Sequence, residues 1–357
     1  MSLDHLIIKP ATKAQAHEAI VRNAAHWGAR AGINVDDYVK LSAIVQEGVF
    51  ARDGRLQTSP SSSFGHLITY VIVPPEHRAK GYAKLFMSLM HSVLAPHRYP
   101  NPVKVPTATD HPSTVSVLYS SVGDYYARCA PLEGESGWTL QKSLITTWRL
   151  SDVQISEGTS PAVKILSESD VTETLDSDDS NIPTDLLELQ EKDPMKTYFA
   201  FVPTAPLNAY SVTLGKLFLK HVDGPSNPSW GAKIPGTSNF MTWTYFGLPN
   251  LELIVTRLRA TADSFPLLLH AALRAARDAK CASVAVWNVP EHLNGIARET
   301  DGETAERDDD LSAFKWYGQE PDLKTDNAGI VWALDERWEL LSHPCFMTYT
   351  PSRYSWC

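Results

Sequence analysis

The sequence has few cysteines, no long hydrophobic run and no excess of positive charge. Its four cysteines are far apart and form no C-x-x-C pair, which argues against a disulfide framework and against a cysteine-rich zinc site. No apolar stretch approaches the roughly 20 residues that a membrane-spanning helix needs, and the N-terminus lacks the basic start and apolar core of a signal peptide. These absences predict a cytoplasmic protein that does not enter a membrane.

The charge balance is acidic, with 32 Lys and Arg residues against 41 Asp and Glu residues. Proteins that bind nucleic acid in general neutralise phosphates with clustered Lys and Arg, so we expect no nucleic-acid partner. The 12 histidines show no metal-ligand spacing, and no bound metal is predicted. A chain of 357 residues can form two hydrophobic cores, so we expect two domains, residues 1–150 and 151–357.

Hydrophobic periodicity predicts alternating strands and helices in both halves. In the first half these are a strand at His5–Lys9, helices over Thr12–Trp27 and Asp36–Val49, a strand over His66–Val73, a helix over Tyr82–Leu94, a strand at Val115–Tyr119 and a short helix over Val122–Cys129. In the second half they are a helix near Pro183–Glu191, strands at Phe240–Phe246 and Leu251–Arg259, a helix over Ser264–Ala279 that Ser264 caps, and a strand at Ser283–Asn288. The acidic and serine-rich residues 151–180 look like the changeover between domains. The pattern predicts an α/β fold with mixed sheets, and the repeated order of elements suggests a second copy of the first domain.

A short glycine-containing loop joins the strand before Pro74 to the helix after it. The loop reads Arg78-Ala79-Lys80-Gly81-Tyr82-Ala83 and fits the pattern R/Q-x-x-G-x-G/A. A tight turn into a helix points unpaired backbone N–H groups at one spot, the helix dipole adds positive potential, and Gly81 allows close approach of an anion. The loop therefore predicts a pyrophosphate site, with an ordinary turn carrying two solvated basic residues as the alternative.

Other nucleotide and catalytic signatures are absent from the sequence. Residues 231–238 imitate a P-loop, but Thr237 stands where the phosphate-binding Lys belongs. The chain contains no G-x-G-x-x-G, G-x-S-x-G or H-E-x-x-H motif. The Arg78–Ala83 loop is thus the strongest functional signal.

Several segments in both halves carry a resemblance to a known family. The chain resembles the fungal lysine N6-acetyltransferase family of the GNAT superfamily in the stretches Val73–Leu85, Ser116–Gly123, Trp243–Arg259 and Val286–Asn288 and in the tryptophan-rich end Trp332–Trp338. The resemblance implies a GNAT-like N-terminal domain and a C-terminal GNAT-like domain that covers the acceptor side. It also implies transfer of acetyl from acetyl-CoA, as co-substrate, to the side-chain amine of lysine or a related small amine in a ternary complex.

The same resemblance assigns roles to individual residues. The main chain of Ile72 and Val73 should bind the pantetheine arm, and the pyrophosphate should be bound by Arg78, Ala79, Lys80, Gly81, Tyr82 and Ala83. Tyr126 matches the tyrosine that acts as general acid, although the family's Gly-aromatic pair is replaced by Ala130-Pro131. A core tyrosine is the alternative role for Tyr126. No general base stands out, and Glu47, Glu76 and His77 are the possible ones.

One part of the expected sheet is too short. Only Arg55–Phe64 separates Gly54 from Gly65, which is too little for the two antiparallel strands that a GNAT sheet has there. The domain should therefore lack two central strands, with the second domain or another chain covering the edge, or with the sheet left incomplete. This leaves two other functions open, a non-catalytic acyl-CoA-binding protein and an acyltransferase of specialised metabolism with another amine acceptor. The acidic stretch Glu299–Asp310 could attract a cationic acceptor, but a solvated loop is the simpler expectation.

Overall fold

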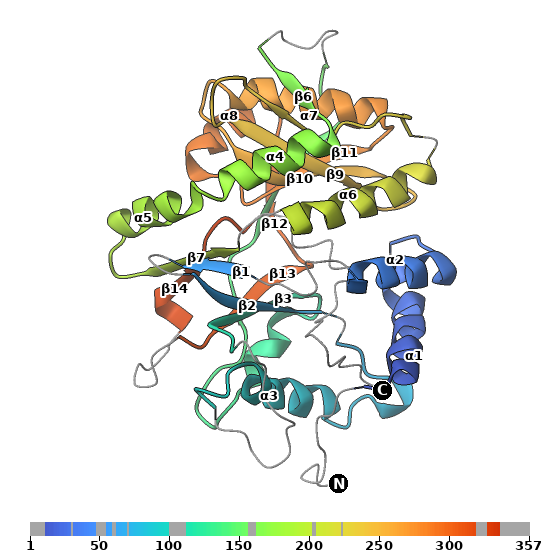
Figure 1. Cartoon of the computed structure of the whole chain (residues 1–357), viewed down its shortest axis with the longest axis vertical. Coiled ribbons are helices and arrows are strands. Elements are labelled where there is room, and N and C mark those ends of the chain that lie inside the picture. The colour runs from blue at the N-terminus through green and yellow to red at the C-terminus, as the bar shows by residue number, and fades with distance from the viewer. Residues whose placement is uncertain are drawn as a thin grey trace.

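Two seven-stranded β-sheets form the frame of the protein, one above the other in Figure 1. In this computed structural model the described residues are 11–29, 31–47, 55–58, 62–69, 71–99, 112–155, 162–201, 205–222, 224–318 and 327–335. Both sheets contain parallel and antiparallel pairs, so the predicted mixed α/β class is confirmed. The strand expected at His5–Lys9 lies outside the described residues.

The first sheet draws its strands from both halves of the chain. In spatial order they are β14 (Ile330–Trp332), β7 (Thr197–Phe201), β1 (Arg55–Thr58), β2 (Ser62–Ile68), β3 (Val115–Ser120), β13 (Leu311–Trp316) and β4 (Thr139–Leu140). The second sheet is built in the same way, in the order β12 (Glu303–Glu306), β5 (Leu144–Arg149), β11 (Ser283–Trp287), β10 (Glu252–Arg259), β9 (Phe240–Phe246), β8 (Gly231–Lys233) and β6 (Lys164–Leu166).

Three strands of the first sheet, β7, β13 and β14, come from the second half, and one strand of the second sheet, β5, comes from the first half. β13, from the second half, lies between β3 and β4 of the first sheet and pairs with β3 over Leu311–Trp316. β5, from the first half, lies between β11 and β12 of the second sheet. A boundary at residue 150 therefore separates the chain in sequence but not the two sheets in space.

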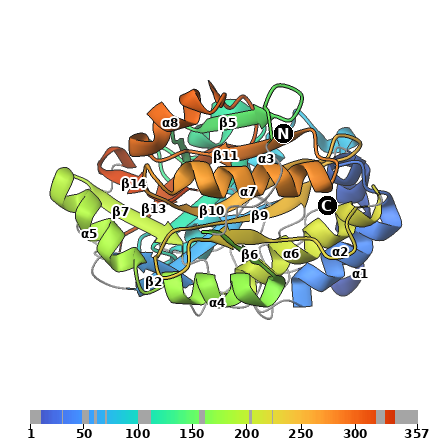
Figure 2. The ribbon, with the colours of Figure 1, turned by 90° about the horizontal axis from the view of Figure 1, so that it is seen from above.

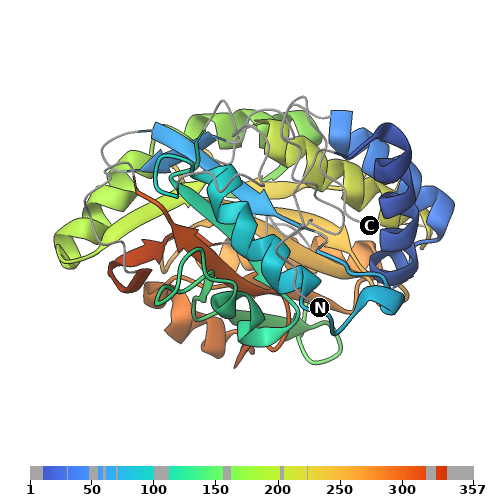
Figure 3. The same ribbon diagram turned by 90° about the horizontal axis from the view of Figure 1, so that it is seen from below.

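Helices cover both sheets. They are α1 (Lys13–Asn23), α2 (Val35–Glu47), α3 (Tyr82–Leu94), α4 (Glu168–Asp178), α5 (Ile182–Lys192), α6 (Ala205–Lys220), α7 (Phe265–Asp278) and α8 (Asn294–Glu299). Short turns are η1 (Ala24–Gly28, a π-helical turn), η3 (Pro75–His77), η4 (Gly123–Arg128), η5 (Glu291–Leu293) and η6 (Asn327–Gly329). Figure 3 shows α3 crossing the lower face of the first sheet, and Figure 2 shows α7 along the second sheet.

The first sheet is buried on both faces. Leu118 of β3 joins Ile68 and Met87 in a core beneath α3, while Val115 and Val117 join a second core on the opposite face. This division follows the two-residue alternation of side chains along a strand. The second face packs Phe199 and Trp332 from the second half, with their rings stacked at 5.9 Å between centroids. Aromatic packing thus joins the two halves across the first sheet.

The short segment before β2 differs from its prediction. Residues 55–64 contain one additional strand, β1, and the first residues of β2, so one of the two strands expected to be missing is present. β1 is only four residues long, and its outer edge pairs antiparallel with β7. Of the three alternatives left open for this edge, the structure shows coverage by the second half, because β7 and then β14 continue the sheet there.

Three other expectations are corrected. The coenzyme-binding strand was placed at His66–Val73, but β2 ends at Ile68 and residues 71–73 leave the sheet. Residues 168–178, which we expected in a changeover region, form α4, because Ser167 and Asp170 make a capping box. The acidic stretch Glu299–Asp310 is not a loop throughout, since Glu303–Glu306 form β12, an exposed edge strand whose charges discourage further pairing.

Candidate active site

Strands β2 and β3 separate at one end of the first sheet. Their parallel ladder ends with the pair Ile68 and Leu118, although β3 continues to Ser120. A cavity of about 450 Å³ lies beyond this point. It is lined by His26, Trp27, Ile68, Thr69, Val71, Ile72, Val73, Arg78, Leu118, Tyr119, Ser121, Val122 and Tyr126. Backbone groups that leave a ladder are open to other partners, so an extended polar ligand can bind between the two strands.

The loop from Arg78 to Gly81 makes a tight turn into α3. Ala79 and Gly81 both have positive φ, 57° and 84°, and Gly81 is the N-cap of α3 without a side-chain hydrogen bond. The first amides of α3 are therefore not capped by a side chain at Gly81 and point toward the loop. Two basic side chains brace the turn, since Arg78 Nε donates to the Val73 carbonyl at 2.9 Å and Lys80 Nζ donates to the Glu76 carbonyl at 2.7 Å.

Tyr126 lies on the other wall of the same cavity. It belongs to η4, and its carbonyl accepts a hydrogen bond from the Trp138 amide at 3.1 Å. Gly137 packs so closely here that an added Cβ would stand 2.3 Å from the Tyr126 carbonyl oxygen. His91 of α3 holds the end of η4, with its Nε2 at 2.8 Å from the Cys129 carbonyl. Tyr126 is therefore fixed by contacts from two separate segments.

The electrostatics of this wall keep its groups neutral. Burial raises the pKa of the Tyr126 phenol, so the hydroxyl keeps its proton at neutral pH. Burial also lowers the pKa of His91 to about 3, which leaves the imidazole uncharged. A protonated phenol can donate a hydrogen bond to an atom that gains negative charge in the cavity.

The cavity brings together residues that are far apart in the sequence. Ile72, Val73, Arg78 and Tyr126 all line it. The other residues assigned to the pyrophosphate, Ala79 to Ala83, form the adjoining loop and the start of α3 and do not line the cavity itself. Of the possible bases, Glu76 and His77 are exposed and outside the lining, and the side chain of Glu47 lies outside the described residues.

Nine of the thirteen lining residues were not among the predicted site residues. Two of them, His26 and Trp27, lie on η1, the π-helical turn from Ala24 to Gly28. The expected helix over Thr12–Trp27, with its regular period of 3.6 residues, placed Trp27 on the core face. That placement is confirmed, because Trp27 packs against the core that contains Ile20 and Tyr38, and it also lines the cavity. A π-turn shifts that period by one residue, and such turns often occur at functional sites. No feature of the local sequence marks this shift.

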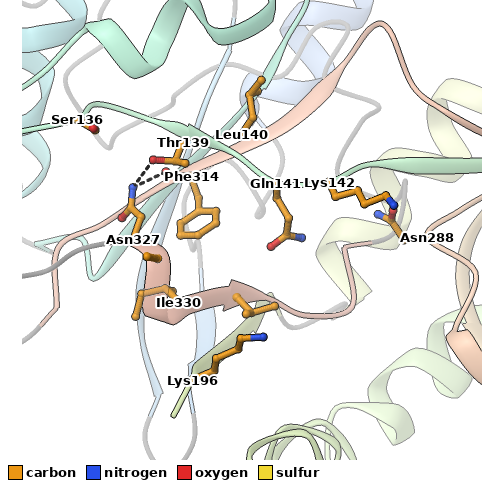
Figure 4. A pocket seen from close by; sticks show the side chains of 12 residues that line it. Ser136, Thr139, Leu140, Gln141, Lys142, Lys196, Asn288, Phe314, Asn327 and Ile330 are labelled. Atoms are coloured by element: carbon orange, nitrogen blue, oxygen red, sulfur yellow. Dashed lines mark hydrogen bonds between the residues drawn. The ribbon is translucent and has the colours of Figure 1, made fainter. Parts of the chain in front are cut away.

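A second cavity lies beside β4, β13 and β14 (Figure 4). The Asn327 amide donates to the Thr139 hydroxyl and to the Phe314 carbonyl, as the dashed lines in Figure 4 show. Gln141 pairs with both backbone groups of Trp332, at 2.9 and 3.0 Å. These amides join strands that come from different parts of the chain, so we assign them a structural role.

Comparison with known proteins identifies the family. A family model described as the LYC1 GNAT-like C-terminal domain matches residues 147–340. This is more than half of the chain, and the chain belongs to this GNAT acetyltransferase family. The match also bears out the predicted GNAT-like second half.

Individual relatives are more distant. The lysine acetyltransferase of Yarrowia lipolytica (strain CLIB 122 / E 150) is 25% identical over 255 residues, which are 63% of this chain and 60% of that protein. The chain thus spans 60% of the length of this curated relative. Among solved structures, a GCN5-related N-acetyltransferase from Kribbella flavida has 15% identity and a TM-score of 0.48, covering 87% of this chain and 70% of its own. A probable N-acyltransferase from Enterococcus faecalis V583 has 12% identity and a TM-score of 0.42, covering 76% and 59%.

Two searches for other kinds of site were negative within the described ranges. No helix there is both long and apolar enough to cross a membrane. No group of three or more His, Cys, Asp or Glu side chains gathers in those ranges where a metal ion could bind.

Proposed function

We propose that this protein is an acetyl-CoA-dependent N-acetyltransferase that acts on the side-chain amine of lysine or of a related small amine. The observation that carries the proposal is the cavity at the end of the β2–β3 ladder, where the segment 71–73, Arg78 and Tyr126 meet. Membership of the GNAT family supports the reaction class. The name of the Yarrowia relative supports lysine as the acceptor.

In this proposal acetyl-CoA lies along the gap between the two strands. The pantetheine arm pairs with the main chain of Ile72 and Val73, and the pyrophosphate lies on the Arg78–Ala83 loop at the N-terminus of α3. The Val73 carbonyl already accepts from Arg78, which holds the loop in place for the arm. The helix dipole and the amides that follow Gly81 stabilise the phosphate charge.

The chemistry then needs little from the side chains. The amine attacks the thioester carbonyl, and Tyr126 donates to the sulfur as it gains negative charge. The raised pKa of Tyr126 keeps the phenol protonated, so its hydroxyl can stabilise the developing thiolate by donating a hydrogen bond. A thiol has an ordinary pKa of about 8.5, so the departing thiolate readily accepts a proton near neutral pH.

The test is a calorimetric titration with acetyl-CoA, followed by measurement of thiol release with a panel of amines that includes L-lysine. Binding and turnover with L-lysine are expected. Binding without turnover on any amine would instead favour a non-catalytic acyl-CoA-binding protein, and turnover only with other amines would favour specialised metabolism. Absence of acetyl-CoA binding would refute the proposal.

A further inference from the structure

A third cavity lies between the two halves and occupies, in the second half, the place that the coenzyme cavity has in the first. The parallel ladder of β10 and β11 ends at Ile254 and Ala285, and the cavity of about 760 Å³ begins beyond it. Its walls come from α5, the end of β10, the turn after β11 and residues 331–335. A volume of this size suits a small molecule.

This cavity is not a second coenzyme site. The turn that leads from β10 into α7 is closed by its own hydroxyl groups, because the Ser264 hydroxyl accepts from the Thr261 amide at 2.8 Å and the Thr261 hydroxyl accepts from the Ser264 amide at 3.3 Å. Asp263 adds a negative charge at the turn. Pyrophosphate binding is therefore disfavoured here, because the amides of Thr261 and Ser264 already donate hydrogen bonds and the charge of Asp263 repels an anion.

The charges that line the cavity suit a cation. Arg259 makes a two-pronged ion pair with Asp185, at 3.0 and 2.5 Å, and Arg257 pairs with Asp178 at 2.8 Å. These pairs neutralise both arginines. The rest of the lining contains three carboxylates, from Glu188, Glu291 and Asp335, against the single ammonium group of Lys192.

Asp335 is the distinctive group of this cavity. Its side chain is 3% exposed, yet it lines the cavity, and its Oδ1 has no hydrogen-bond partner among the described residues. The backbone around it is unusual, since Leu334 and Asn288 have positive φ angles of 54° and 47°. The side-chain amide of Asn288 donates a hydrogen bond to the main-chain carbonyl of Asp335 at 2.7 Å. Strained backbone of this kind gathers at functional sites.

Asp335 also adjoins the coenzyme cavity. Tyr119 lines that cavity, and its side chain interacts with the Asp335 carboxyl. Trp332 lines the third cavity, and its ring lies 5.7 Å from that of Tyr119. The linings of the two cavities thus meet where Tyr119 contacts Trp332 and Asp335, on the face of the first sheet away from α3.

We propose that the third cavity binds the primary amine of the acceptor as its ammonium cation and that Asp335 is the proton acceptor for the reaction. This inference rests on the proposed function. The ammonium nitrogen loses two protons as the N–C bond forms and the C–S bond breaks. One passes to Asp335, which releases it to water, and the other ends on the CoA sulfur.

The surroundings of Asp335 set its protonation. Burial raises the pKa of Asp335 to about 6, against the opposing effects of the Ser312 hydroxyl, the Arg307 charge and the side chains of Tyr119 and Asn288. The other charged or titratable groups that line the cavity are Asp185, Glu188, Lys192, Tyr198, Arg257, Arg259, Glu291 and His292. A carboxylate with this pKa is ionised at neutral pH and is a stronger base than an ordinary aspartate.

The first arm of the test blocks the cavity. Leu189→Trp places an indole in it from α5, and Leu187→Trp is the matched control, since Leu187 is 48% exposed on the same helix and does not line the cavity. Binding of L-lysine and of acetyl-CoA is measured separately by calorimetry. Leu189→Trp should weaken L-lysine binding at least tenfold and spare acetyl-CoA, whereas Leu187→Trp should change neither. Equal L-lysine binding by both variants would overturn the proposed acceptor site.

The second arm tests Asp335 through the pH dependence of kcat/KM for L-lysine. In the wild type, kcat/KM should level off above about pH 7, because Asp335 is then ionised. Asp335→Asn should lower it by about 100-fold at pH 7. In that variant it should rise tenfold per pH unit toward the amine's own pKa of about 10.4, since only the free amine then reacts. A purely structural aspartate would not change this slope.

The outcomes separate the two proposals. Wild-type turnover with an unchanged pH profile in Asp335→Asn refutes the role of Asp335 and leaves the proposed function intact. L-lysine binding that Leu189→Trp abolishes, without turnover in the wild type, supports the acceptor cavity and refutes the transferase function. Retained acetyl-CoA binding shows in each variant that the protein is folded.

Discussion

The loop after β2 and the loop after β10 occupy equivalent places in the two sheets, but their helices begin differently. α3 begins at Gly81 with positive φ, no side-chain cap and two basic residues beside it. α7 begins at Ser264, whose hydroxyl bonds back to Thr261 rather than capping the helix as we had expected, and Pro266 lies in its first turn. In our proposal the turn before α3 binds an anion, whereas the hydroxyl and amide groups of Thr261 and Ser264 hydrogen-bond to each other in the turn before α7.

The difference indicates how two similar halves can divide one reaction between them. A strand separation forms a cavity in both sheets, at Ile68–Leu118 and at Ile254–Ala285. Beside the second cavity, Asp178 and Asp185 hold the arginines of β10 in ion pairs, whereas beside the first cavity Arg78 and Lys80 donate to main-chain carbonyls. In our proposals the first cavity therefore binds the acyl donor and the second binds the acceptor.

The largest effect is expected from breaking the ion pairs of the second half. Asp178 and Arg257 are almost fully buried, so Asp178→Ala leaves a buried guanidinium without its partner and should cost about 3–5 kcal/mol of unfolding free energy. Burial by itself would raise the pKa of Asp178, but the charges of Arg257 and Arg259 outweigh it and lower the pKa. The stabilisation is therefore present above about pH 4, the ordinary carboxyl pKa, and is lost as pH falls through the lowered folded-state pKa. Urea denaturation at pH 3 and pH 7 measures both.

Asp179→Asn is the control for this variant. Burial raises the pKa of Asp179 to about 7, which is the opposite direction from Asp178. Its ionised form is disfavoured in the folded protein, so removing the charge should not destabilise the protein at pH 7 or above. A large loss of stability there would contradict the different roles assigned to these adjacent carboxylates.

The second prediction breaks the anion-binding turn. Gly81→Asp introduces a side chain at a φ of 84° and a negative charge beside the expected phosphates, so acetyl-CoA binding should weaken more than 100-fold. The matched change in the other half is Ala262→Asp, at an exposed position in the loop before α7. Calorimetry should show unchanged acetyl-CoA affinity for Ala262→Asp, and equal losses in both variants would remove the distinction between the loops.

The third prediction concerns the acid. Tyr126→Phe keeps the ring that packs in η4 and removes only the hydroxyl, so acetyl-CoA affinity should stay within about twofold while kcat falls about 10- to 100-fold. Tyr125→Phe is the neighbouring control because Tyr125 does not line the cavity. Full activity in Tyr126→Phe would show that another group protonates the sulfur.

The smallest effect is expected from the self-satisfied turn. Ser264→Ala removes the hydroxyl that accepts from Thr261 and should lower the unfolding free energy by about 1 kcal/mol. Acetyl-CoA affinity should not change, because this turn takes no part in coenzyme binding. Thermal unfolding with and without acetyl-CoA tests both statements together. A changed coenzyme affinity would contradict the proposal that only the first cavity binds acetyl-CoA.

Local patterns in the sequence correctly predicted those helices and strands whose apolar residues follow one regular period from end to end. The helix over Tyr82–Leu94 and the strand at Phe240–Phe246 have the bounds that periodicity indicated. Hydrophobic periodicity did not predict the bounds of strands that depend on pairing with a neighbouring strand. β2 stops at Ile68 because β3 no longer pairs with it, although the apolar run continues to Val73. β1, β7 and β14 are short, and each becomes a strand only through its neighbours in the first sheet.

The amino-acid sequence by itself determined the GNAT character of the chain and the position of the turn to which we assign anion binding, because both depend on residues that are adjacent along the backbone. Arg78, Gly81 and the amphipathic face of α3 lie within one continuous segment. Only the tertiary structure decided that β7, β13 and β14 join the first sheet and β5 the second, and that Asp335 of the third cavity contacts Tyr119 of the first. Those arrangements depend on pairing and packing between distant segments, which no local pattern records. In our proposals the Arg78–Ala83 loop, which the sequence indicated, binds the coenzyme. The cavity that binds the acceptor is formed only when distant segments of the chain fold together.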